Sequence, residues 1–83
     1  MRAVIVTWHD AHADGAWMTT AEVDGDPYVV RSIGWELPGV KPGHFSLAQS
    51  RGHADTWDNI LHIPTGMVVR VQQVASFPNL RLR

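Results

Sequence analysis

A period-two alternation of apolar and polar residues constrains this 83-residue chain more than any other feature. The opening segment places Val4, Val6 and Trp8 on one side of an extended chain, with Ile5 and Thr7 on the other. β-Branched residues in this pattern predict a strand with one buried face. The alternation recurs four more times, so the sequence predicts strands near residues 3–8, 28–37, 44–50, 57–63 and 67–74.

Turn residues separate these segments. The stretch LPGVKPG, residues 37–43, is rich in Pro and Gly, and the polar run RGHAD, residues 51–55, predicts a hairpin loop. Only residues 64–66 separate the last two strands, and Pro64 cannot donate to a sheet ladder. By analogy, this ending is typical of Src-homology and Sm-like barrels. We therefore predict an all-β fold, a small five-stranded, strongly bent antiparallel barrel formed by residues 1–75.

The predicted core follows the apolar face of each strand, and Gly34 within the second strand suggests a bend or bulge. The long first loop, residues 9–26, has room for at most one helical turn before Pro27. The core residues that we expect are Val4, Val6, Trp8, Val29, Ile33, Trp35, Leu37, Phe45, Leu47, Leu61, Ile63, Val69 and Val71.

Composition narrows the classes of function. The chain has no cysteine, which excludes disulfide frameworks, zinc ribbons and thiol catalysis. Its net charge is −1, a poor balance for non-specific binding to nucleic acid, which needs several cations against phosphates. The opening apolar run is too short for a signal peptide, and no stretch is long enough to span a membrane. We expect a cytoplasmic protein without a cofactor.

The segment WHDAHADGAW, residues 8–17, is the one candidate for a metal or catalytic site. His9, Asp10, His12 and Asp14 are residue types that metals use, but the flanking alternation puts them at a strand end and no E-x-x-H spacing appears. We interpret the segment as a polar loop in which Asp10 accepts hydrogen bonds from backbone N–H groups. No G-x-S-x-G, H-E-x-x-H or P-loop pattern organises a catalytic site, and we expect no enzyme.

Four segments in order, VTWHDAH, VVRSIGW, GHFSLAQS and IPTGMVVRV, resemble a group of small uncharacterised proteins encoded by tailed bacteriophages of actinobacteria. The group pattern combines W-x-D, V-x-S-x-G-W, L-A-Q-S and I-P-x-G-x-V, and the chain departs from it at Glu36, where an apolar residue would follow the tryptophan. The resemblance implies a phage accessory protein that works inside a bacterial host. It carries over no site residues.

Protein–protein interaction is the function that we predict, with a host or phage partner or a second copy. An exposed edge strand, surplus tryptophans and the tail of residues 76–83 are the expected means. The candidate interaction residues are Trp17, Trp57, Phe77, Leu80, Arg81 and Arg83. The alternative is a small barrel that binds nucleic acid through scattered arginines and an exposed Trp17 or Trp57. The arginines in question are Arg31, Arg51, Arg70, Arg81 and Arg83.

The loop interpretation of residues 9–14 predicts that no structural zinc is bound there. Adding a chelator should therefore leave the melting temperature unchanged, as followed by circular dichroism. A drop in melting temperature that added zinc restores would establish a real metal site, because a metal held only by the folded state stabilises that state.

Overall fold

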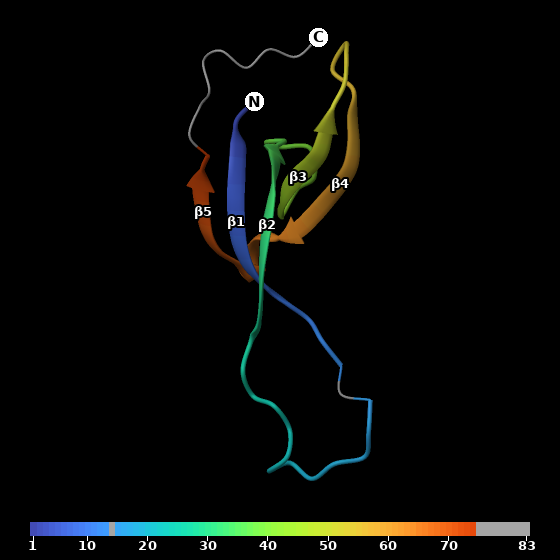
Figure 1. Cartoon of the computed structure of the whole chain (residues 1–83), viewed down its shortest axis with the longest axis vertical. Helices are drawn as coiled ribbons and strands as arrows, with labels where there is room; N and C mark the ends of the chain where they lie inside the picture. The colour runs from blue at the N-terminus through green and yellow to red at the C-terminus, as the bar shows by residue number, and fades with distance from the viewer. Residues whose placement is uncertain (14, 75–83) are drawn as a thin grey trace.

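The computed structural model describes residues 1–13 and 15–74 and contains the five predicted strands (Figure 1). Their bounds agree with the sequence prediction to within a few residues. The elements are β1 (Ala3–Asp10), β2 (Tyr28–Glu36), β3 (His44–Arg51), β4 (Trp57–Pro64), the 3₁₀ turn η1 (Thr65–Met67) and β5 (Val68–Gln73). The all-β fold class is confirmed. Within the described residues no helix has the length and apolarity that a membrane span requires.

All five strands form one antiparallel sheet in the order β4-β3-β2-β1-β5. Consecutive strands are neighbours from β1 to β4, and β5 returns to pair with the other side of β1. No ladder joins β4 to β5 among the described residues, so the sheet is open between its two edges. The predicted closure into a barrel is therefore not confirmed.

The connection between β4 and β5 forces the sheet to bend. The two strands are opposite edges, which in a flat five-stranded sheet lie about 19 Å apart. Residues 65–67 alone join them, and four Cα steps reach at most about 14 Å when fully extended, and less in a 3₁₀ turn. The turn is fixed to the start of β3, because the Thr65 N–H and hydroxyl both donate to the Gly43 carbonyl, at 3.0 and 2.7 Å.

The core lies inside this bend. Val4 and Val6 from β1 meet Leu47 from β3 and Ile63 from β4, and all four side chains are buried. The partly buried side chains that pack around them are Trp8, Phe45, Val68 and Val71. These eight residues come from four strands, so the sheet buries its inner face against itself without a covering helix.

The prediction of which β2 residues face the core is wrong. The register with β1 pairs Val4 with Gly34 and Val6 with Ser32, so the small residues of β2 face the core. Val29 and Ile33, which we expected in the core, lie on the outer face with more than half of their surface exposed. The physical reason is the pairing with β1: the residues opposite the buried Val4 and Val6 lie on the same inner face, where Trp8 donates from its Nε1 to the Ser32 hydroxyl at 3.0 Å.

Two further core predictions fail for local reasons. Val69 is exposed because the β1–β5 register shifts between Thr7 and Trp8, which turns Val68 toward the core in its place. Leu61 is opposite the buried Leu47 but is 40% exposed, because the sheet opens beside it. Of the other expected core residues, Trp35 is half-buried and Leu37 is buried just after β2 ends.

Gly34, where the sequence suggested a bend or bulge, lies at a close approach of β2 to the backbone of β3. A Cβ atom added there would lie 2.6 Å from the carbonyl oxygen of Ala48 in β3. This is far inside van der Waals contact, and the obstacle is backbone, which cannot rotate away. Glycine is required here because β2 and β3 cross at close range.

Gly34→Ala should therefore destabilise the fold, by about 1–3 kcal/mol for forced overpacking. Gly25→Ala is the matched control, because a Cβ at that loop position meets nothing within 4 Å. Urea denaturation measures both variants. Equal stability of the Gly34→Ala and Gly25→Ala proteins would contradict the close crossing.

Candidate interaction surface

Strands β2 and β3 separate soon after they cross. Their ladder contains Trp35 opposite Ala48 and Glu36 opposite Leu47, and beyond it the Leu37 N–H donates to the Ser46 carbonyl at 2.9 Å. Toward the start of β2 no β3 residue is paired, although β2 continues for seven more residues as far as Tyr28. The first part of β2 is thus hydrogen-bonded in register only to β1.

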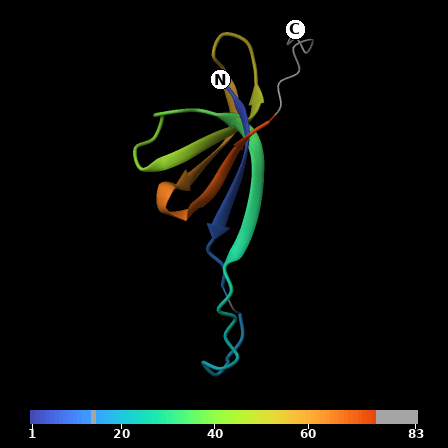
Figure 2. The same ribbon diagram turned by 90° about the vertical axis from the view of Figure 1, so that its left-hand side faces the viewer.

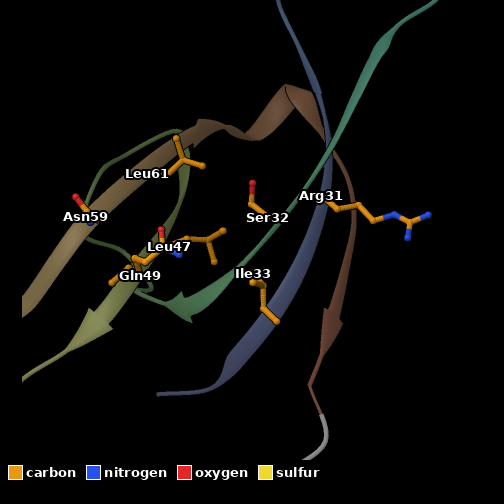
Figure 3. A pocket seen from close by; sticks show the side chains of 8 residues that line it. Arg31, Ser32, Ile33, Leu47, Gln49, Asn59 and Leu61 are labelled. Carbon is orange, nitrogen blue, oxygen red and sulfur yellow. The ribbon is translucent and has the colours of Figure 1, made fainter.

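The separation opens a cavity of about 280 Å³, which we call the β2–β3 groove (Figure 3). Its walls come from β2 on one side and from the β3–β4 pair on the other. The lining residues are Arg31, Ser32, Ile33, Leu47, Ala48, Gln49, Asn59 and Leu61. In Figure 3 the Arg31 side chain points away from the groove, on the side of β2 opposite to Leu61. The groove combines an apolar wall with two side-chain amides.

The backbone of β2 turns hydrogen-bonding groups toward this groove. The Glu36 N–H donates to the Arg2 carbonyl and the Leu37 N–H to the Ser46 carbonyl, both at 2.9 Å. Because peptide groups alternate in direction along a strand, even-numbered residues of β2 bond to β1 and odd-numbered residues face β3. Arg31 and Ile33 are odd-numbered and have no β3 residue opposite them. Their N–H and C=O groups therefore form an open strand edge inside the sheet.

The far wall of the groove contains a strained residue. Asn59 has a φ of 51° in the middle of β4, a left-handed conformation that costs roughly 1–2 kcal/mol for most residues and least for Asn, Asp and Gly. Its N–H donates to the Asp58 carboxylate at 2.9 Å instead of continuing a regular ladder. Strain of this kind collects at binding sites, where it holds a side chain in place.

The outer face beside the groove is cationic. Thr7 of β1 pairs with Arg31 on one side and Arg70 on the other, so both exposed arginines lie in one row across the sheet. Neighbouring outer-face positions hold Ile5, Ile33 and Gln72. No paired position of the β2–β1–β5 outer face carries an acidic residue.

One ion pair occurs within the described residues, between Arg2 and Glu36, and Glu36 belongs to the inner-face positions of β2. The Arg2 guanidinium donates to Glu36 through Nε at 2.6 Å and through Nη2 at 3.3 Å. This hydrogen bond, together with the charge of Glu36, raises the pKa of Arg2, which is charged near neutral pH in either case. Glu36 is thus paired with Arg2, and Arg31 has no carboxylate partner in residues 1–13 and 15–74.

Residues 11–13 and 15–27 belong to an arm that extends well beyond the sheet (Figure 2). Short-range bonds shape it: the Glu22 N–H donates to the Thr19 carbonyl at 3.0 Å, which makes a single turn and no helix, as expected. His12 contacts the Tyr28 ring at the base, with the ring centroids 5.9 Å apart. Trp17 on this arm is fully exposed.

Trp57, the second tryptophan that we singled out, is half-buried and already engaged within the chain. Its Nε1 donates to Asp55 at 2.9 Å, and the Arg51 guanidinium lies 5.4 Å from its ring and 5.5 Å from that of Trp35. The two tryptophan rings are 6.5 Å apart. This cation–π cluster fixes the end of the β3–β4 hairpin against β2, and it leaves Trp57 less free than Trp17 to meet a partner.

The structure confirms part of the interpretation of residues 9–14. Asp10 accepts a hydrogen bond from the Ala11 N–H at 2.8 Å, the local backbone contact that we expected. His9 is half-buried in β1, while Asp14 lies outside the described residues. Among the residues that are described, no three His, Asp or Glu side chains gather closely enough to hold a metal ion.

The tail residues proposed for interaction, namely Phe77, Leu80, Arg81 and Arg83, lie outside the described residues. One serine–histidine pair is present in the described part: Ser46 Oγ is 2.6 Å from His62 Nδ1. Ser46 is only 2% exposed, so its hydroxyl is shielded from any substrate and serves to link β3 to β4.

Comparisons with protein-family models, with curated proteins and with solved structures found no match to this chain.

Sequence reasoning identified Trp17 but missed the β2–β3 groove. The groove depends on where the β2–β3 ladder stops, a long-range property that alternation within one strand does not contain. Gly34 was the available signal, since a glycine within a strand suggests close approach of another backbone.

The open edge predicts an alternation in amide exchange along β2. The amides of Ser32 and Gly34, which face β1, should exchange with deuterium at least about tenfold more slowly than those of Arg31 and Ile33. Nuclear magnetic resonance on the free protein measures all four rates. Uniform protection along these four residues would mean that another group pairs with the edge.

Proposed function

We propose that this chain is a non-enzymatic bacteriophage accessory protein that acts in the cytoplasm of a bacterial host by binding another protein. The observation that carries the proposal is the complete exposure of Trp17 on an arm that extends away from the sheet. A tryptophan buries some 150–250 Å² when it docks, and tryptophan is the residue most enriched among side chains that dominate interface energies. Docking onto a partner would remove this apolar surface from water, which is favourable.

The phage and host parts of the proposal rest on the sequence resemblance, whose motifs extend from Trp8 to Val68. A small barrel of Src-homology or Sm-like type is the architecture that we propose with it. The support is the strand order, with β5 beside β1, and the single 3₁₀ turn that joins β4 to β5 across the bend. The non-enzymatic part is supported by the burial of Ser46, which keeps the one serine–histidine pair of the described residues from reaching a substrate.

Nucleic-acid binding is the second candidate, and one observation favours it. Arg31 and Arg70 flank Thr7 on an outer face that carries no paired acidic residue, and such a row could contact successive phosphates. Against this, Arg51 is occupied between two tryptophans and the net charge of the chain is −1. We therefore favour a protein partner.

Trp17→Ala should strongly weaken partner binding without altering the fold. The tagged protein is used to capture partners from host lysate, and the affinity of the partner so identified is then measured with purified components. Loss of a dominant interface tryptophan should weaken binding by about thirtyfold or more. The melting temperature should not change, because Trp17 is fully exposed in the free chain.

Val23→Ala is the matched control, because Val23 lies on the same arm and is only half exposed. This variant should keep most of the affinity. If the Trp17→Ala protein binds its partner as well as the unaltered chain does, the arm is not the contact and the proposed function loses its main support. A captured complex that nuclease treatment dissolves would favour the nucleic-acid candidate instead.

A further inference from the structure

The β2–β3 groove has the geometry of a site for one additional strand. Its β2 wall presents the backbone of Arg31 and Ile33, which have no β3 residue opposite them, and Val29 continues the same edge. A strand edge with open N–H and C=O groups is the template that extended peptides use when they add to a sheet. Here the template lies within the sheet, beside a cavity of about 280 Å³.

We propose that the groove binds an extended, acidic and apolar segment of a protein partner, which adds to the sheet as a strand antiparallel to β2. The inference rests on the proposed protein-binding function and names the chemistry of the partner at a second site. The direction follows from β3, which is antiparallel to β2 and occupies the same side of it at Trp35. The added strand continues the sheet where β3 turns away.

The register of pairing with β2 decides which side chains of the added strand face outward and which face the groove. Residues opposite Ile33 and Arg31 face outward, and the residue between them, opposite Ser32, faces into the groove. An apolar side chain suits the position beside Ile33, which is 60% exposed. A carboxylate suits the position beside Arg31, which has no acidic partner within the described residues. The inward residue is apolar and packs against Leu61.

Two amides on the far wall complete the site. Gln49 and Asn59 line the groove opposite β2, and each can donate to or accept from a peptide backbone. No carboxylate lines the groove, so nothing in its wall repels an acidic segment. The charge of Arg31 and Arg70 on the adjoining outer face favours the same partner chemistry.

The test uses the full chain and a synthetic hexapeptide, acetyl-Thr-Val-Leu-Glu-Thr-Val-amide. Its first Val is placed opposite Ile33 and its Glu opposite Arg31. We expect saturable binding with slower amide exchange at Arg31 and Ile33. N-methylation of the peptide at the first Val and at Glu removes the hydrogen bonds that these two amides donate to β2. It should weaken binding by about tenfold or more. N-methylation at Leu and the following Thr, whose amides point away from β2, is the matched control and should cost less than about threefold.

Variants of the protein make the test specific. Ile33→Glu and Arg31→Glu should each weaken binding, whereas Val69→Glu, at a similarly exposed position on β5, should not. Arg31→Glu should instead prefer the peptide in which Lys replaces Glu. Trp17→Ala should leave peptide binding unchanged, so failure at the groove is distinguishable from failure of the proposed function at the arm.

Four results would overturn the inference. The first is absence of saturable binding at millimolar peptide, and the second is an equal loss from both N-methylated peptides. The third is binding of oligothymidine that perturbs Arg31 and Arg70 without protecting the β2 amides, which would assign the face to nucleic acid. The fourth is protection of these amides by raised protein concentration alone, which would assign the groove to a second copy.

Discussion

The short connection across the open side of the sheet is the constraint on which the rest of this structure depends. Because η1 joins two strands that are opposite edges, the sheet cannot be flat. The bend brings β2 and β3 together at Gly34 and separates them again beyond that point. One consequence is a core built from β1, β3, β4 and β5, and another is the groove. The core and the candidate peptide site are thus two results of the same geometry.

How far the sequence could predict this structure depends on the range of the interactions involved. Strand positions depend on local alternation and turn residues, and all five were found in this way. The facing of β2 was predicted wrongly, because Val29 and Ile33 are more apolar than Ser32 and Gly34 and were assigned to the core. The pairing with β1 decides the facing instead, since Gly34 and Ser32 lie opposite the buried Val4 and Val6. Residue hydrophobicity within one strand does not contain this register.

The candidate site, like the fold, could be predicted from the sequence only in part. Trp17 was predictable as an interaction residue because it lies in a loop without the alternation that would bury it. Trp57 looked equivalent in sequence, yet Arg51 and Asp55 engage it through contacts that only the folded hairpin creates. The row of Arg31 and Arg70 about Thr7 joins three strands and was invisible in the chain order, where these arginines seemed scattered.

The pairing of β1 with β2 at the base of the arm determines how freely the arm can change in length and sequence. The β1–β2 ladder runs without interruption to Asp10 opposite Tyr28, so the sheet fixes both ends of the arm independently of what lies between them. Loop-closure entropy rises only with the logarithm of length, at about 0.6 kcal/mol for each doubling. Insertions or deletions in residues 11–27 therefore change reach and chemistry at little cost to the sheet. Such a loop lets the length and chemistry of the arm change separately from folding.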